Sequence, residues 1–189
     1  LNILHLVRMP NPSERMRCYP HELSVGMQQR VLIAAAISCV PLLLIADEPT
    51  TALDVTVQKQ ILRLLQDMRK KVGSVLYITH NLGIVAEICD NVNVMYLGKI
   101  VESGSVKEVF KEHKHPYTEL LFGVIPRNVQ RGDLSVPMES VGSSTDLPSG
   151  CRYHPRCPKA MQLCREEEPK LVTVGGEHMV SCHIFRDER

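Results

Sequence analysis

The sequence predicts an α/β fold in which short buried strands alternate with helices and pair into a parallel sheet. Residues 42–46 and 74–79 are short, mostly apolar runs, which is typical of strands covered on both faces. Between them, residues 55–72 carry apolar side chains at a helical period. Strands that alternate with helices in this way predict an α/β fold.

The helix before the first strand begins after Ser24, whose hydroxyl can accept a hydrogen bond from an early helical amide. This helix is expected to run to about Ser38, and Pro41 enforces the break before the strand. Gly73 is expected to end the next helix. Further along, we predict helices at 82–89, 106–112 and 117–124 and strands at 92–97 and 100–102, these two joined at Gly98-Lys99.

The 189 residues are 44% hydrophobic and 23% charged, with a formal net charge of +1. This composition is that of a globular protein, and the near-neutral charge argues against a nucleic-acid partner. No signal peptide follows Leu1, and the apolar stretch 31–46 is too short and too interrupted to span a membrane. We expect an α/β part at 1–112, a helix and polar linker at 113–150 and a cysteine-rich unit at 151–189.

Two adjacent carboxylates, Asp47 and Glu48, follow the first predicted strand. In open α/β sheets, catalytic groups collect at the carboxyl ends of strands. The first carboxylate can hold Mg²⁺ through its water shell, and the second can polarise a water for attack on a γ-phosphate. Taken alone, the pair is explained equally well as a solvated acidic turn ahead of Pro49.

Further elements change that balance. Ser24 and Gly26 begin a helix whose free amides and positive dipole end suit an anion. His80 follows the second strand, where it can donate a hydrogen bond to a γ-phosphate oxygen. Each element has a structural alternative, Ser24 as a simple cap and His80 as a surface residue, but their shared order and spacing make coincidence very improbable.

With these residues the chain resembles the nucleotide-binding subunits of ABC transporters. Residues 23–30 (LSVGMQQR) are similar to the signature loop, 42–47 to Walker B, Glu48 to the catalytic glutamate, 52–54 to the D-loop and His80 to the switch histidine. The resemblance implies a P-loop NTPase-like, three-layer ABC ATPase core, of which this chain holds only a part. It also implies catalysis by Glu48 and His80, with ATP and Mg²⁺ bound.

The resemblance further implies how the binding residues are shared. In the family, two subunits pair head to tail, and each ATP lies between one subunit's Walker A loop and the other's signature loop. Asp47, as the Mg²⁺ residue, would serve this chain's own nucleotide together with Glu48 and His80. Ser24, Gly26 and Asp54 would serve the partner's nucleotide, and Gln28 in the signature loop is also expected to bind nucleotide.

The sequence departs from the family in two ways. Val25 stands where the family usually has glycine, and a β-branched side chain there could crowd the nucleotide and resist a positive φ. We expect a weakened partner site, which an unchanged ATPase rate in Val25→Gly would contradict. No Gly-x-x-x-x-Gly-Lys-Ser/Thr stretch is present to cradle phosphates. We therefore expect a chain truncated at its N-terminus that neither binds nor hydrolyses ATP appreciably by itself.

A second string, His115-Pro116-Tyr117-Thr118-Glu119-Leu120-Leu121, follows the predicted ATPase part. Its His and Tyr could be simple packing residues. The string is nevertheless similar to the one that follows the core in ATPase subunits of oligopeptide and dipeptide importers. Residues 19–24 (YPHELS) and the cysteine-rich end resemble the same subgroup. The resemblance implies the energy-coupling subunit of a peptide importer.

Four of the seven cysteines, Cys151, Cys157, Cys164 and Cys182, lie in the last 39 residues. Four thiolates suit either a tetrahedral Zn²⁺ or an iron–sulfur cluster. No Cys-x-x-Cys knuckle is present among them, and the wide spacings favour a [4Fe-4S] cluster, which the resemblance also implies, over zinc. Four buried free thiols are the weakest alternative, because so small a unit with few large apolar residues needs a staple.

The resemblance implies ATP hydrolysis coupled to transport, by a peripheral protein on the cytoplasmic face of the membrane. Its partners would be a second ABC ATPase subunit, in a homo- or heterodimer, two membrane-spanning permease subunits and, indirectly, an extracytoplasmic substrate-binding protein. We expect no nucleic-acid partner. The alternatives are a non-transport ABC ATPase of DNA repair or translation, which usually lacks the His115-Pro116-Tyr117 string, and an inactive fragment.

Overall fold

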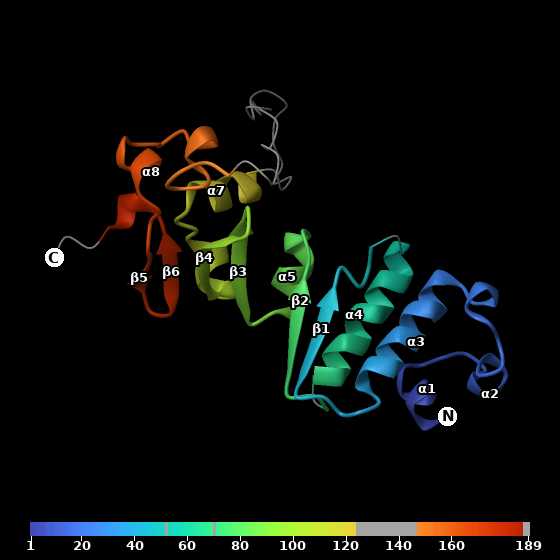
Figure 1. The fold of residues 1–189 in the computed structure, drawn as a ribbon. Coiled ribbons are helices and arrows are strands. Elements are labelled where there is room, and N and C mark those ends of the chain that lie inside the picture. The colour runs from blue at the N-terminus through green and yellow to red at the C-terminus, as the bar shows by residue number, and fades with distance from the viewer. Residues whose placement is uncertain (52, 70, 124–146, 187–189) are drawn as a thin grey trace. The chain divides into compact units, whose positions relative to one another are not determined.

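The computed structural model describes residues 1–51, 53–69, 71–123 and 147–186. It divides into two compact units, Leu1–Ile88 and Cys89–Arg189 (Figure 1). The division predicted from the sequence, at 112 and 150, does not coincide with these units, because strands from both sides of it share one sheet. The predicted linker at 126–150 lies mostly outside the described residues.

The first unit contains two parallel strands and the helices around them. Strand β1 (Leu43–Asp47) pairs with β2 (Ser74–Ile78), with Leu43 opposite Ser74 and Asp47 opposite Ile78. This confirms the two predicted strands and the predicted helix between them, α4 (Val55–Arg69), which connects them. The other elements are α1 (Asn2–Leu6), α2 (Pro12–Arg15), a 3₁₀ turn (Pro20–Glu22), α3 (Val25–Ile37) and α5 (Leu82–Ile88).

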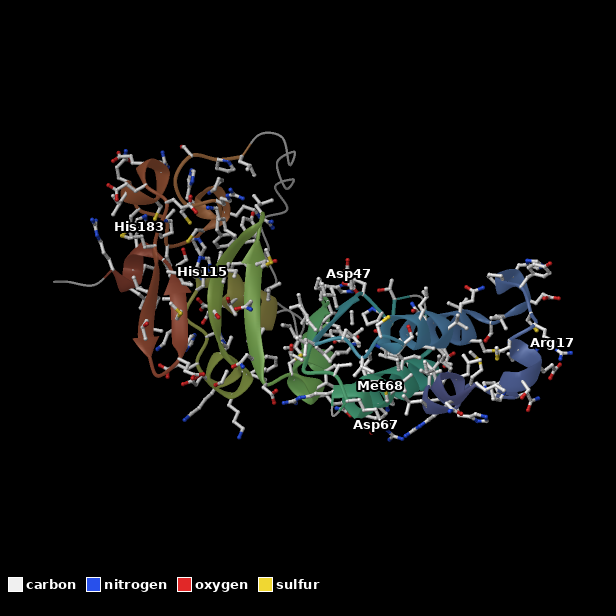
Figure 2. The ribbon with its side chains drawn as sticks, turned by 60° about the horizontal axis from the view of Figure 1, so that its bottom comes forward. Arg17, Asp47, Asp67, Met68, His115 and His183 are labelled. Atoms are coloured by element: carbon white, nitrogen blue, oxygen red, sulfur yellow. The ribbon has the colours of Figure 1, made fainter. Side chains whose placement is uncertain are left out.

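Helices α3 and α4 supply the core of this unit. Ile33 and Ile37 of α3 and Leu64 and Met68 of α4 are buried in one cluster with Leu44 of β1. Figure 2 labels Met68 on α4. The helices therefore cover one face of the two-stranded sheet.

Arg30 joins three helices of the first unit from within its core. The residue is 7% exposed, and its guanidinium donates to the Val7 carbonyl after α1 and to Gln60 Oε1 of α4, both at 2.7 Å. Both acceptors are neutral, and burial lowers the Arg30 pKa from its ordinary value. The side chain thus fixes α3 against α1 and α4.

The opposite face of the sheet is apolar and open. Leu43, Ile45, Leu76 and Ile78 alternate with the core residues along the strands and are 44–60% exposed. Strands of parallel sheets are normally covered on both faces. The third layer expected from the sequence is not found among the described residues of this unit.

The second unit contains an antiparallel sheet in the order β3-β4-β6-β5. The strands are β3 (Asn91–Tyr96), β4 (Lys99–Ser105), β5 (Leu171–Gly175) and β6 (His178–Ser181). Around them lie α6 (Val106–Lys111), α7 (Pro116–Gly123), α8 (Leu163–Glu166) and 3₁₀ turns at His154–Arg156 and His183–Phe185. Because β6 pairs with β4, the cysteine-rich end is not the separate irregular unit that the sequence predicted.

The hairpin of β3 and β4 turns one residue earlier than predicted. Leu97 and Gly98 both have positive φ, 43° and 79°, as a two-residue type I′ turn requires. Arg152 donates to the Leu97 carbonyl and so ties the turn to the cysteine-rich segment. Across the described residues, no helix is both long enough and apolar enough to cross a membrane.

A fully buried carboxylate, that of Glu102 on β4, joins three parts of the second unit. Its Oε1 accepts from the Lys114 amide and lies 2.7 Å from His178 Nε2 of β6. Its Oε2 accepts from the His115 amide at 3.0 Å. The loop before α7 and strand β6 are therefore held to β4 through one side chain.

His115 is 1% exposed, and its Nδ1 accepts from the Tyr117 amide at 3.1 Å. The neutral ring therefore carries its proton on Nε2. Burial lowers the pKa of His115 from 6.5 to about 4, against the opposing effect of the Glu102 charge. The string that resembles the peptide-importer subgroup thus begins with a buried neutral histidine.

We predict a pH dependence of stability from this group. The unfolded chain binds the His115 proton below about pH 6.5, whereas the folded chain resists it until about pH 4. The unfolding free energy should therefore fall by up to about 3 kcal/mol between these pH values. Denaturant unfolding of the full chain between pH 7 and 4 measures this change. His115→Asn, which keeps an acceptor but does not titrate, should show a shallower slope; equal slopes contradict the prediction.

Candidate functional site

The carboxyl ends of β1 and β2 bring Glu48 and His80 together. His80 Nδ1 lies 2.7 Å from Glu48 Oε1, and the His80 amide donates to the same oxygen at 3.2 Å. The two residues stand 32 positions apart in the sequence. They meet because the parallel register ends both strands at one edge, with Asp47 opposite Ile78.

The Glu48 carboxylate is held on both oxygens. Its Oε2 accepts from the Thr51 hydroxyl at 2.9 Å. The hydrogen bond from His80 and, second, the one from Thr51 lower the pKa of Glu48 below its ordinary value. The carboxylate is thus ionised at neutral pH and can accept hydrogen bonds from a water.

The backbone of Glu48 takes a conformation uncommon for a residue with a side chain. Its φ is +44°, and its amide donates to the Ile78 carbonyl at 3.0 Å. Left-handed non-glycine residues are costly, and such strain gathers at functional sites. This conformation lets the chain turn directly after β1 while the carboxylate stays beside His80.

Asp47 is the last residue of β1, and its side chain is exposed (Figure 2). An exposed carboxylate beside Glu48 suits a hydrated Mg²⁺, which prefers carboxylate and water ligands. Sequence reasoning did not single out Thr51, whose hydroxyl completes the Glu48 contacts. A signal was available in the Glu48-Pro49-Thr50-Thr51 turn, where the Thr51 amide bonds the Glu48 carbonyl at 3.2 Å.

The beginning of α3 carries the second group of predicted residues. Ser24 is the N-cap, as predicted, and its Oγ accepts from the Met27 amide at a long 3.4 Å. Val25 is the first residue of α3 and has helical backbone, not a positive φ. The prediction that Val25 must resist a positive φ is therefore wrong. The side chain of Val25 is 53% exposed. That it crowds a bound nucleotide stays a prediction.

The other predicted residues here have clear structural contacts. A Cβ built on Gly26 would lie 2.7 Å from Val57 Cγ1, so glycine lets α3 approach α4 closely. Asp54 Oδ1 accepts from the Thr56 and Val57 amides, both at 3.0 Å, and caps α4. Gln28 donates to backbone carbonyls of the preceding loop. Position 52 of the predicted D-loop lies outside the described residues.

The four C-terminal cysteines are free thiols. Burial raises the pKa of Cys151 and Cys157, and raises that of Cys182 to about 11. Electrostatic interaction with Cys157, Cys151 and Cys164 raises the pKa of Cys182 further. Within the described ranges, however, no three His, Cys, Asp or Glu side chains are placed to hold a metal ion. The ligand geometry predicted for a cluster or zinc is thus not formed in this structure.

Backbone amides nevertheless point at these sulfurs. The Met161 amide donates to Cys164 Sγ at 3.5 Å. Hydrogen bonds from the amides of Tyr153, Lys159 and Ile184 partly offset the raised pKa of Cys151, Cys157 and Cys182 respectively. Such donors favour a thiolate over a thiol. The chemistry of the donor set therefore suits a thiolate-bound group, although the ligand distances do not.

Two family models match the chain in succession. The model described as "ABC transporter" matches residues 1–51, and the one described as "Oligopeptide/dipeptide transporter, C-terminal region" matches residues 101–164. The first model covers Ser24, Gly26 and Gln28 at the beginning of α3 and the Asp47-Glu48 pair. The second covers Glu102, the His115 string and three of the four cysteines.

Curated relatives match the whole chain. It is 49% identical to the dipeptide transport ATP-binding protein DppD of Haemophilus influenzae and 47% identical to the oligopeptide transport ATP-binding protein AppD of Bacillus subtilis. Each comparison covers 100% of this chain and 58% of the relative. The chain thus spans somewhat more than half the length of these relatives.

Solved structures show a similar fold. CbiO1 from Clostridium perfringens, part of the ABC transporter complex cbiONQ, matches with a TM-score of 0.50 and 39% identity, over 59% of this chain and 43% of that one. An ATP-binding cassette of an ABC transporter in its ADP conformation matches with a TM-score of 0.55 over 65% of this chain and 48% of that one. At 24% identity, the second shows the fold alone.

Proposed function

We propose that this chain belongs to the ATP-binding proteins of ABC transporters, in the oligopeptide and dipeptide group, and that it contributes half of an ATP-hydrolysing site to a peptide importer. The observation that carries the proposal is the Glu48–His80 contact at the edge where β1 and β2 end. An ionised carboxylate and an imidazole at that edge can orient a water and a γ-phosphate for hydrolysis.

Glu48 acts on the attacking water in this proposal. Its carboxylate accepts a hydrogen bond from the water and takes up the proton as the water oxygen bonds to the γ-phosphorus and ADP leaves. Asp47, one residue earlier on the same strand end, would hold the hydrated Mg²⁺ that neutralises charge on the phosphates when bound. The exposed position of Asp47 supports this role.

The tautomer of His80 limits how it can act. When Nδ1 donates to Glu48, a neutral ring has no proton on Nε2 to donate to a phosphate. His80 must therefore either be protonated or leave Glu48 when nucleotide binds. The side chain is 82% exposed, so it can turn without disturbing the core.

Ser24, Gly26 and Asp54 serve the nucleotide of a second ATPase subunit in this proposal. They lie at the N-termini of α3 and α4, where helix amides and dipoles favour phosphate. The head-to-tail partner, which is a second copy or a related subunit, supplies the phosphate cradle for that nucleotide. No glycine-rich phosphate loop occurs in the 189 residues, so this chain by itself should hydrolyse ATP negligibly.

The exposed apolar face of the first sheet supports the proposal that further secondary structure packs against it. Leu43, Ile45, Leu76 and Ile78 form an exposed apolar face on a parallel sheet, which such sheets seldom leave in water. The relatives hold considerably more chain than the part matched here. We infer that structure of the kind found in the remainder of those relatives covers this face and brings the phosphate loop.

The names of the relatives, which refer to dipeptide and oligopeptide transport, support a role in transport. We propose that nucleotide-driven closing of two such subunits moves two membrane-spanning permease subunits, with a substrate-binding protein delivering the peptide from the other side. The protein would then be peripheral on the cytoplasmic face of the membrane. Phosphate release by the assembled complex tests the ATPase role; release unchanged by Glu48→Gln contradicts it.

A second proposal concerns Cys151, Cys157, Cys164 and Cys182. Their mutual electrostatic influence and the amide donors to their sulfurs support a site for a [4Fe-4S] cluster, with Zn²⁺ as the alternative. Because burial keeps three of these thiols protonated, binding would release protons and weaken as pH falls.

The absorbance spectrum of protein purified without oxygen tests this site. A cluster gives brown protein with absorbance at about 400 nm, and zinc gives colourless protein with bound metal. Cys182→Ala should remove the absorbance, whereas Cys39→Ala, at an exposed cysteine of the first unit, should leave it unchanged. Colourless, metal-free protein contradicts the proposal.

A further inference from the structure

The loop before Ser24 is held by hydrogen bonds from one side chain of α3. Gln28 Nε2 donates to the Pro20 carbonyl at 2.7 Å and to the Leu23 carbonyl at 3.2 Å. Gln28 is the fourth residue of α3, so its side chain reaches back past the N-cap. The two carbonyls belong to the first and last residues of the segment 20–23, which directly precedes Ser24.

Gln28 has no amide hydrogen left for a ligand. A glutamine amide carries two N–H donors, and both are directed at loop carbonyls. To donate to a phosphate, Gln28 would have to release Pro20 or Leu23. This argues against the direct nucleotide contact that the sequence predicted for Gln28.

Two further contacts stiffen the same loop. Glu22 Oε2 accepts from the Tyr19 amide at 2.6 Å, and the rings of Tyr19 and His21 stack with centroids 5.7 Å apart. The loop is exposed over most of its length, so these local contacts rather than a core fix its shape.

Ser24 depends on that loop for its position. Its cap bond to the Met27 amide is 3.4 Å long, at the weak end for a hydrogen bond of this type. The hydroxyl is therefore only loosely fixed by the helix and remains able to donate elsewhere. Gln28 fixes the residue from both ends: its amide donates to the Ser24 carbonyl at 2.9 Å, and its side chain binds the carbonyl of the neighbouring Leu23.

We propose that Gln28 is a positioning residue that sets Ser24 for the partner's nucleotide by binding the Pro20 and Leu23 carbonyls, and is not itself a nucleotide ligand. This inference rests on the proposed function. The partner's phosphate loop holds most of the ground-state nucleotide, so misplacing Ser24 acts mainly after binding, on the closed and reacting state.

Two variants separate positioning from general structure. Gln28→Glu has nearly the same shape but offers no donor, and it faces the two carbonyls with a charge. Gln28→Arg keeps donors for both carbonyls. Each variant is studied in the full-length protein assembled with its transporter partners, with hydrogen exchange of the 19–24 amides and steady-state ATP hydrolysis as readouts.

We expect Gln28→Glu to speed exchange in 19–24 and to lower kcat about tenfold, with KM for ATP within about twofold of wild type. Gln28→Arg should restore both readouts. Unchanged exchange, unchanged kcat, or a rise in KM alone each overturns the inference, since a KM effect indicates a direct ligand. Glu48→Gln is measured in parallel: if it hydrolyses ATP normally, the proposed function fails; if only Gln28→Glu behaves normally, the positioning role alone fails.

Discussion

Replacing Glu102 with alanine is expected to lower the free energy of unfolding of the Cys89–Arg189 unit by about 3 to 5 kcal/mol. The carboxylate is 0% exposed and accepts from two backbone amides while contacting His178 Nε2. Its removal leaves the Lys114 and His115 amides and the His178 ring buried without their acceptor. Unpaired buried donors carry their full desolvation cost, which exceeds the worth of the bonds themselves.

Near-UV circular dichroism of the full chain during denaturant unfolding measures this change. Three tyrosines of this unit contribute strongly to the signal, since Tyr96, Tyr117 and Tyr153 pack with centroids 4.7–5.5 Å apart. Glu102→Gln keeps one acceptor oxygen for the amides and should cost clearly less than Glu102→Ala. A loss below about 1 kcal/mol in the alanine variant would show that the carboxylate does not hold the unit together.

Glu48→Gln is expected to lower ATP hydrolysis by the assembled complex by about a hundredfold or more, the usual effect of removing a positioned base. Glutamine keeps the shape and can still accept from Thr51, so the turn after β1 should persist. What it lacks is the charge, which the hydrogen bonds from His80 and Thr51 stabilise by lowering the Glu48 pKa.

Phosphate release at saturating ATP measures the Glu48→Gln effect. The melting temperature of the variant serves as its structural control and should stay near that of the wild type, because Glu48 lies at the surface edge of the sheet. Asp67→Asn, a surface change on α4 that removes the exposed ion pair with Arg8, should leave hydrolysis unchanged. A rate for Glu48→Gln within about threefold of wild type would argue against a catalytic role.

Local signals in the sequence predict much of the site. Ser24 has the side chain that an N-cap needs, and it caps α3. The apolar runs before Asp47 and His80 predict parallel strands, and parallel strands that end at one edge bring Glu48 to His80. These features depend on neighbours within a few residues and on one simple rule of sheet geometry.

Features set by distant contacts could not be predicted in the same way. Glu102 looks like a surface residue of a short strand, and its burial is explained by two amides of the loop before α7 and by its contact with His178, 76 positions away. Pairing of β4 with β6 likewise places the cysteine-rich end in the same sheet as β3, against the predicted boundaries. No periodicity or spacing in the chain encodes such a pairing.

The role of one glycine was also predicted for the wrong reason. Gly73 follows α4, but it does not have the positive φ of a helix-ending glycine. A Cβ at this position would lie 2.7 Å from the Leu42 carbonyl oxygen, so the residue is small because two backbone segments approach each other there. This close contact between residues 42 and 73 lies directly before the first pair of the sheet, Leu43 and Ser74. It helps to set the register of β1 and β2.

Retention of labelled ATP by the assembled complex carrying Glu48→Gln tests most directly whether Glu48 and Ser24 act on nucleotides held between two subunits. If they do, blocking hydrolysis traps the closed pair, and the label stays bound as ATP through rapid gel filtration. Ser24→Arg in the same background should abolish the retention by obstructing the partner's nucleotide. Label that washes out as fast as from wild type, or that is recovered as ADP, would contradict the account.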